Sequence, residues 1–431
     1  MPDAYRVRPD REFLDHILDG GGADLKKCFQ CATCSVVCEL CSGRAVFPRK
    51  EMIWAQWGLK EKLAADPDVW LCHQCNDCST RCPRGARPGD VLAAVRREAV
   101  QHYSVPRFLS VWANSFAHLP VMLLIPVVLL VLALLLRRPL EGVEALSGVL
   151  GLADHHGFYA DLFPHWLLIG FFSLFTGLAF VAAVAGVVRF WRAMKAADVA
   201  SGGYAPTSGI IPGLGRTLKT IFSHDKFSKC ERHGGRRWVH LGSFYGFAAL
   251  FVVSAWAVVA LYMINPLITN DFVYPFRFWN PWKILANVAC IALIIGCIKA
   301  IVDRKRSPES SGASTSFDWI FVWLLLSVAV TGLLTEVFRF VADPGVYGDE
   351  HAVWTGVQYV AYAIYFVHLV LVFDLLVYLP YSKFAHILYR TAALVYAEHT
   401  GRSREVVRAA LPEVEVRQQD EQGAEQVVEA A

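Results

Sequence analysis

Two runs of cysteines near the N-terminus share a regular spacing, and nine of the twelve cysteines lie between Cys28 and Cys82. Each run follows the pattern Cys-x2-Cys-x2-Cys-x3-Cys, and the members are Cys28, Cys31, Cys34 and Cys38, then Cys72, Cys75, Cys78 and Cys82. Three thiolates spaced by two residues wrap one face of an iron–sulfur cubane, whereas the remote fourth cysteine is better placed for the other cluster. This geometry predicts two [4Fe–4S] clusters, one held by Cys28, Cys31, Cys34 and Cys82 and the second by Cys72, Cys75, Cys78 and Cys38. A zinc site normally uses two pairs of ligands, which these runs match poorly.

The first run departs from the bacterial ferredoxin pattern after its fourth cysteine. Pro83 follows Cys82, as in that pattern, but Glu39 follows Cys38. Cys41 is either a substitute ligand or a buried thiol, and the second interpretation is preferred. The clustering of the cysteines indicates metal binding rather than disulfides scattered over an exported domain.

A second set of candidate ligands lies in the apolar stretch 366–390, which carries His368 and His386. Their separation is about five helical turns, so a single helix would point both imidazoles in one direction, about 27 Å apart along its axis. This distance is close to the thickness of the hydrocarbon core of a bilayer, about 30 Å. Pro380 is expected to kink the helix. Two histidines so placed could each bind haem iron, and the alternative is a pair of polar side chains near the membrane interfaces.

The composition indicates that these residues belong to a polytopic membrane protein, because hydrophobic residues make up 55% and charged residues only 18% of the chain. Six apolar spans long enough to cross a bilayer are predicted, at about 109–136, 163–188, 239–264, 283–302, 317–340 and 358–381. Basic residues concentrate in the stretch 189–238, interpreted as a loop after the second span, and at 304–306, after the fourth. The positive-inside rule therefore places the cysteines and both termini in the cytoplasm. The N-terminus lacks the apolar core of a signal peptide, so we expect the cysteine-rich part to stay in the cytoplasm. We expect the whole chain to be a multi-pass protein of the cell inner membrane.

The predicted fold is mostly α-helical and has three parts. Residues 1–104 form an α-helical, ferredoxin-like domain with two [4Fe–4S] clusters, including a helix from Pro48 to Lys62 and a closing helix over 90–104. Residues 105–400 form a six-helix transmembrane haem b domain. Residues 401–431, rich in Glu, Gln, Val and Ala, form a flexible cytoplasmic tail.

The candidate haem ligands can be paired by their predicted depth in the bilayer. His240 lies at the inner edge of the third span and His386 at the inner end of the sixth, so we pair them around an inner haem b. For a second, outer haem b, His368 needs a partner at the outer side, and His165, at the start of the second span, matches best; otherwise His368 binds nothing. The weaker candidates for this partner are His118, His155, His156 and His351. His233 is interpreted as a loop residue.

The C-terminal two thirds of the chain resemble the cytochrome b component of respiratory nitrate reductases. The last helix of that family also carries a histidine, a proline-containing stretch of eighteen residues and a second histidine, and a histidine before small and aromatic residues begins the helix that corresponds to His240. The resemblance implies haem b. In that family a second histidine follows ten residues later, but here that position is Leu250. An outer haem therefore cannot use the family ligand.

The cysteine-rich part resembles the small iron–sulfur subunit of heterodisulfide reductases and the iron–sulfur subunits of succinate and fumarate oxidoreductases. The order of the two domains, over nearly the whole chain, resembles the C-subunit family of the quinone-interacting membrane-bound oxidoreductases of sulfate reducers. This resemblance implies menaquinone as substrate, cytoplasmic partner subunits that carry flavin and iron–sulfur clusters, and electron delivery toward adenylylsulfate reductase in sulfate respiration. It rests on the cluster cysteines and on His240, His368 and His386.

Haem in the bilayer and two cubanes in the cytoplasm predict an electron-transfer subunit of a quinone-linked oxidoreductase. The sequence has no GxGxxG loop after a strand and no adjacent Cys-Cys pair of the catalytic heterodisulfide reductase type, so substrate chemistry is expected on partner subunits and no catalytic residue is assigned. The alternatives are the membrane anchor of a heterodisulfide reductase-like or sulfite-reduction complex, and a redox sensor or structural anchor. Asp374 either makes a structural hydrogen bond or exchanges protons with quinone. The net charge of +3 gives no indication of a nucleic-acid partner, and none is expected.

Overall fold

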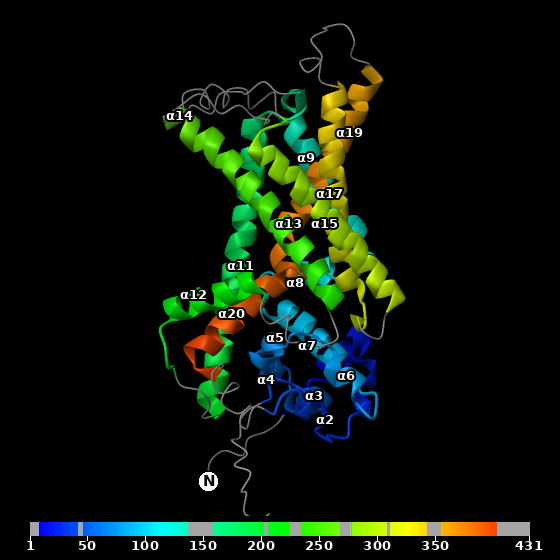
Figure 1. Cartoon of the computed structure of the whole chain (residues 1–431), viewed down its shortest axis with the longest axis vertical. Helices are drawn as coiled ribbons and strands as arrows, with labels where there is room; N and C mark the ends of the chain where they lie inside the picture. The colour runs from blue at the N-terminus through cyan, green and yellow to red at the C-terminus, as the bar shows by residue number, and fades with distance from the viewer. Residues whose placement is uncertain are drawn as a thin grey trace, which may run out of the picture.

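The computed structural model describes residues 8–41, 46–136, 158–201, 206–224, 234–267, 276, 278–307, 311–342 and 355–402. Figure 1 shows them in two parts, a bundle of long helices and a smaller domain of short helices at one end of the bundle. The described residues are mostly helical and contain no β-strand. The predicted mostly α-helical fold is therefore confirmed.

The smaller part, here called the cysteine-rich domain, is formed by the N-terminal residues. Its helices are α1 (Arg11–Ile17), η1 (Leu18–Gly22), η2 (Ala23–Lys27), α2 (Thr33–Val36), α3 (Arg49–Gln56), α4 (Lys60–Ala64), α5 (Asp68–Leu71), α6 (Asp77–Thr80) and α7 (Pro88–Tyr103). The helix predicted from Pro48 to Lys62 is divided into α3 and α4 at Gly58, whose φ of +60° glycine adopts without strain. The predicted closing helix is α7, and its apolar side, with Leu92 and Val95, is buried in the core of the domain.

The bundle contains the candidate membrane spans. Its long helices are α9 (Leu119–Leu135), α11 (His165–Ser201), α13 (Gly234–Val259), α15 (Pro281–Arg306), α17 (Ser316–Ala342) and α19 (Thr355–Val377). Six stretches of the described chain, which include these helices, are long and apolar enough to cross a membrane, as predicted. The first begins at Phe116 rather than near residue 109, because the short helix α8 (Arg107–Ala113) precedes it.

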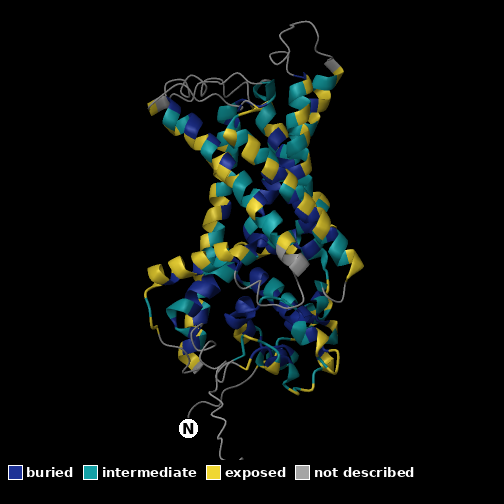
Figure 2. Cartoon of the chain, in the orientation of Figure 1, coloured by how far each residue is buried: buried dark blue, intermediate teal, exposed yellow. Residues whose placement is uncertain are grey.

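The outside of the bundle suits a lipid environment. Figure 2 shows many exposed residues along the bundle helices, in contrast to the buried interior of the cysteine-rich domain. Large apolar side chains are among them, including Leu124, Leu178, Phe180 and Phe251. An apolar surface of this extent, with six helices of sufficient length, is consistent with a multi-pass membrane protein.

The stretch 366–390 is not one helix. α19 ends at Val377, a 3-10 turn η8 (Leu379–Tyr381) follows, and a separate helix α20 (Ala385–His399) carries His386. The prediction of a single kinked helix that points both histidines the same way is therefore wrong. Pro380 has no N–H to donate and its ring excludes the carbonyl four residues earlier, so the helix stops before it.

Contacts with the segment that enters the membrane hold this break in place. The hydroxyl of Tyr381 donates to the carbonyl of Val105 across 2.8 Å. The hydroxyl of Ser110 in turn donates to the carbonyl of Tyr381 across 3.0 Å. A backbone carbonyl that the broken helix leaves unpaired is thus satisfied by α8.

α20 lies between the bundle and the cysteine-rich domain (Figure 1). On the bundle side it packs against α11, which continues to Ser201 and is about 55 Å long at 1.5 Å per residue. On its outer side it packs against α12 (Ile210–Ser223). The stretch 189–238 was predicted as a loop, and this prediction is wrong for the residues in α11 and α12. Trp70, Tyr103, Phe190 and Tyr389 are buried together where α5, α7, α11 and α20 meet, here called the junction.

Candidate iron–sulfur and haem sites

The two cysteine runs fold into the same local structure. In the first run Gln30 and Ala32 have positive φ, 59° and 66°, and in the second Gln74 and Asn76 have 54° and 70°. A short helix, α2 or α6, begins directly after the second of these residues. The left-handed turns reverse the backbone between successive cysteines, so each run curls around a hollow.

Each hollow takes its fourth cysteine from the other run. The first hollow is lined by Cys28, Cys31, Cys34 and Cys82. The second hollow is lined by Cys72, Cys75, Cys78 and Cys38. The structure thus brings together the two sets of four that the spacing assigned.

The chemistry of these thiols fits a positively charged occupant. Burial, together with neighbouring thiolates, raises the pKa of Cys34 to about 11. Burial likewise raises the pKa of Cys38 to about 12, and it also raises the pKa of Cys78. Four converging thiolates repel one another unless cations lie between them, and the irons of a cubane supply that charge.

Backbone N–H groups point at the sulfurs as well. The amide of Gln74 donates to Sγ of Cys72 across 3.3 Å, and the amide of Ala86 donates to Sγ of Cys82 across 3.4 Å. Such bonds stabilise sulfur that carries negative charge. The donor sets therefore fit two [4Fe–4S] clusters. Cys41 is half-buried and is not among the residues that line either hollow.

His386 has the hydrogen bond expected of a metal-binding histidine. Its Nδ1 lies 2.5 Å from the carbonyl oxygen of Lys383. A carbonyl only accepts, so Nδ1 carries the proton and Nε2 keeps the lone pair that could bind iron. Burial lowers the pKa of His386 to about 3, and His240 is among the groups that contribute to the lowering. His386 is therefore neutral, as a ligand must be, and His240 on α13 lies close to it.

His224 is a further histidine at this place, and the sequence interpretation missed it. It is buried directly after α12, and its ring centroid lies 5.2 Å from that of His240. The ring of His240 therefore contacts that of His224, whereas His386 is linked to His240 by an electrostatic influence on its pKa. The apolar residues of α12 at helical spacing, such as Ile210, Leu214 and Leu218, were the signal that could have placed a surface helix here and His224 at its end.

His368 faces a neighbouring helix of the bundle. Its Nδ1 lies 3.0 Å from Oγ1 of Thr331 on α17, and that hydroxyl donates to the carbonyl of Ser327. Gly332 leaves room for the ring, because a Cβ there would lie 3.1 Å from Cε1 of His368. His165 is half-buried at the start of α11. Of the weaker candidates, His118 stacks on Trp112, and His155, His156 and His351, like His233, lie outside the described residues.

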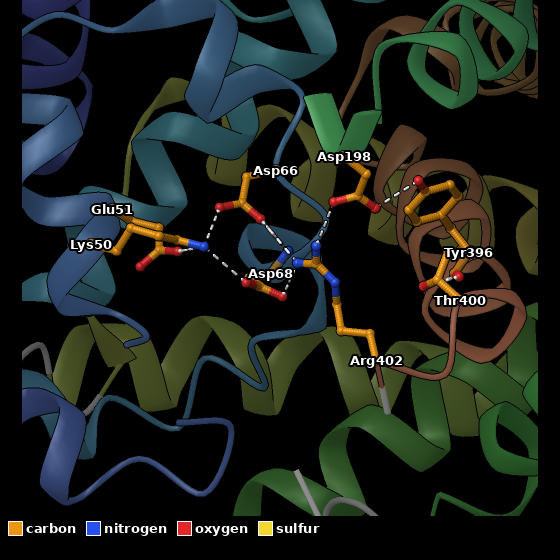
Figure 3. Close-up of polar contacts among 8 residues, drawn as sticks. All are labelled: Lys50, Glu51, Asp66, Asp68, Asp198, Tyr396, Thr400 and Arg402. Atoms are coloured by element: carbon orange, nitrogen blue, oxygen red, sulfur yellow. Dashed lines mark hydrogen bonds and ion pairs between the residues drawn. The ribbon is translucent and has the colours of Figure 1, made fainter. Parts of the chain in front are cut away.

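A buried ion network joins the cysteine-rich domain to the chain beyond α20 (Figure 3). The carboxylates of Glu51, Asp66 and Asp68 converge as metal ligands might be expected to. Lys50 occupies their centre, however, with Nζ at 3.1, 2.8 and 3.0 Å from Glu51, Asp66 and Asp68. The guanidinium of Arg402 reaches Asp68 at 2.8 Å and Asp198, near the end of α11, at 3.0 Å. Cationic side chains thus lie where a metal ion would, so the cluster serves as a structural link.

Comparisons with known proteins agree with the cysteine-rich domain. Residues 24–86 match the family model of the 4Fe-4S dicluster domain. Over 94 residues the chain is 40% identical to the C subunit of the H(2):CoB-CoM heterodisulfide,ferredoxin reductase of Methanothermobacter marburgensis, which is 21% of this chain and 50% of that protein. Over 97 residues it is 32% identical to a protein of Archaeoglobus profundus that is similar to the C subunit of heterodisulfide reductase, which is 22% of this chain and 52% of that protein. The chain thus spans about half the length of these relatives.

One relative extends beyond this domain. The citrate utilization protein B of Escherichia coli is 28% identical over 341 residues, which is 75% of this chain and 80% of that protein. A match of this length must include a large part of the helix bundle. No solved structure matches the chain. The predicted heterodisulfide reductase C-like iron–sulfur domain is confirmed: the cysteine-rich part of the chain is a 4Fe-4S dicluster domain related to the C subunits of heterodisulfide reductases.

Proposed function

We propose that this iron–sulfur protein transfers electrons between menaquinone in the membrane and cytoplasmic partner subunits that bear flavin and iron–sulfur clusters. Haem b in the bundle would exchange electrons with the quinone, and the two [4Fe–4S] clusters would exchange them with the partners. The observation that carries the proposal is the position of α20, which bears His386 at one end and contacts the second hollow through Arg390. In the proposal, this one helix links the membrane site to the cytoplasmic site.

In this proposal the cysteines of each hollow are the cluster ligands, and His240 and His386 hold an inner haem b. Neutral imidazoles with the free Nε2 of His386 support this assignment. His368, with Nδ1 bonded to Thr331, would also keep Nε2 for iron. A second, outer haem with His165 as its other ligand is the finer part of the proposal. The cysteine-rich domain and both termini would lie on the cytoplasmic side of the inner membrane.

The first hollow is the place where a soluble partner would receive electrons. Cys31 is exposed, and the side chains of Phe29 and Val36 beside it are 67% and 85% exposed. The second hollow lies against α20 instead. The proposed order is therefore haem, second cluster, first cluster, partner. On the resemblance of the whole chain to subunits of sulfate reducers, the final acceptor proposed is adenylylsulfate reductase.

A citrate-utilization system is the alternative that a specific observation favours, because the relative named for it matches three quarters of this chain. A heterodisulfide reductase-like complex is a further alternative, because the C subunits of such complexes match the cysteine-rich domain. They do not match the bundle. All three share the same electron path through this protein and differ in the soluble partner. Identification of the chains that co-purify anaerobically in mild detergent, with an assay of bound flavin, distinguishes them.

The electron path itself is tested with a menaquinol analogue added to the purified complex. We expect the haem spectrum to become that of the reduced form, followed by the signals of reduced clusters in electron paramagnetic resonance. A complex that contains both cofactors but is not reduced by the quinol would contradict the proposal. Pyridine haemochrome measurement of two haems per chain would support the outer site, and one haem would exclude it.

A further inference from the structure

Arg390 lies one turn after His386 on the same face of α20. Residues four apart on a helix are neighbours, so the two side chains extend from adjacent turns. An Nη atom of Arg390 donates to the carbonyl of Cys72 across 3.2 Å, and the other lies 3.3 Å from Nδ1 of His73. One helical turn and the side chain of Arg390 therefore connect a proposed haem ligand to the backbone of a proposed cluster ligand.

A second arginine reaches the same carbonyl from the other side. Arg96 on α7 donates to the carbonyl of Cys72 across 2.8 Å, and it also bonds Val69 and Gln74. Two guanidinium groups thus converge on one cysteine of the second hollow. Guanidinium stays charged in proteins, and its charge counts for more in a buried setting than in water.

The first hollow has a different electrostatic setting. Arg49 and Arg84 line it. Arg49 is exposed, and the guanidinium of Arg84 lies 4.3 Å from the centre of the ring of Phe29, which is 67% exposed. Solvent screens charge there. Positive charge close to a cluster favours the reduced form, which carries one more negative charge, so the two clusters should differ in potential.

We propose that Arg390 is a positioning residue that raises the reduction potential of the second cluster and holds that cluster against the haem helix. The proposal rests on the proposed function. In the step that it favours, a haem held by His240 and His386 would supply one electron, and a cluster held by Cys72, Cys75, Cys78 and Cys38 would accept it, so that the haem would be oxidised and the cluster reduced by one electron each. No bond or proton changes place. The electron comes from menaquinol, and it leaves through the first cluster.

The test is a redox titration of the purified complex with chemical mediators, followed by electron paramagnetic resonance. Cys31→Ser and Cys75→Ser identify the signals of the first and second clusters. In Arg390→Gln, we expect the electron-sharing equilibrium between haem and second cluster to move about tenfold toward the haem, which is about 59 mV for one electron. The first cluster should keep its potential. Arg390→Lys retains the charge and should restore most of the potential.

Arg84→Gln is the matched control, since it removes an arginine from the first hollow and should leave the second cluster unchanged. Unaltered potentials in Arg390→Gln, or equal shifts of both clusters, would overturn the proposal. If Arg390→Gln does not fold, Arg390→Lys becomes the test. A second-cluster potential equal to that of the unchanged protein supports the role of charge, and a potential lowered by about 59 mV contradicts it. The titration needs neither quinol nor partner, so its outcome is separate from that of the proposed function.

Discussion

Arg402 and Asp68 are 334 positions apart in the chain and form a buried ion pair 2.8 Å long. Asp68 begins α5, directly before the second cysteine run, and Arg402 follows α20. The pair therefore fixes the end of the bundle to the cysteine-rich domain.

Arg402→Gln should loosen the cysteine-rich domain. Removing one partner of a buried ion pair leaves an uncompensated charge and costs about 3–5 kcal/mol. The exposed pair of Arg216 and Glu398, 2.9 Å apart, is the control. Arg216→Gln should cost less than about 1 kcal/mol. Thermal unfolding of both variants in detergent, with limited proteolysis of the domain, measures the difference, and equal effects would contradict the structural role of Arg402.

Asp68 should make the connection sensitive to strong acid. Burial alone would raise its pKa, but Arg402 and Lys50 lower it below the ordinary value. A carboxylate with a lowered folded pKa stabilises the fold above its unfolded pKa, about 3.9, and this stability is lost as pH falls through the folded pKa. The difference in proteolytic protection between the unchanged protein and Asp68→Asn should therefore stay constant from neutral pH to about 5 and decrease only below about 4.

Glu51 should have the opposite effect. Burial, with the nearby carboxylates of Asp66 and Asp68, raises its pKa well above the usual value despite Lys50. Its contribution to stability is complete below the unfolded pKa, about 4.3, and is lost as pH rises through the folded pKa. Glutamine cannot ionise, so the free energy of unfolding of Glu51→Gln should lack this loss, which is about 1.36 kcal/mol per pH unit. Unfolding midpoints are measured across pH for both proteins. If Glu51 were ionised in the fold, the midpoints of Glu51→Gln would change with pH as those of the unchanged protein do.

Cys38→Ser should remove a ligand of the second cluster while the first cluster remains. Cys41→Ser is the matched control, because Cys41 is near in sequence but is not among the residues that line either hollow. Iron and acid-labile sulfide should fall to about half only in the Cys38 variant, which loses one of two equal clusters. A comparable loss in the Cys41 variant would make Cys41 the ligand.

The three histidines at the inner end of the bundle can be separated by their alanine variants. His240→Ala and His386→Ala should each abolish the inner haem, whereas His224→Ala should retain it with an altered spectrum. Pyridine haemochrome and absorption spectra of the membranes measure this. If His224→Ala loses haem and His386→Ala keeps it, His224 is the second ligand of His240.

The local patterns in the sequence were sufficient for the helical fold and for the four-cysteine sets. A spacing of two residues between cysteines and about twenty apolar residues per span are local properties, so neither requires knowledge of the fold. The exchange of Cys38 and Cys82 between the two hollows also follows from the size of a cubane. The sequence could place His224 at the end of a helix but could not show its approach to His240, because that depends on how α12 packs.

The sequence also could not predict the helix break at Pro380 or the ion network, because both depend on contacts between residues far apart in the chain. Proline occurs both in kinked and in broken helices, and here the break is held by Val105 and Ser110, almost three hundred residues earlier. Arg402 was interpreted as part of a flexible tail, yet it is buried. Contacts at such sequence separation leave no periodic signal.

The junction also determines how electrons can travel. The rings of Trp70 and Tyr389 are stacked with their centroids 5.5 Å apart, and aromatic side chains from α7 and α11 pack around them. A domain held in this way does not swing between a position near the membrane and a position near a partner. In the proposed function, electrons cross a fixed distance between α20 and the cysteine-rich domain, so the rate of transfer across the junction should not change with the viscosity of the solvent.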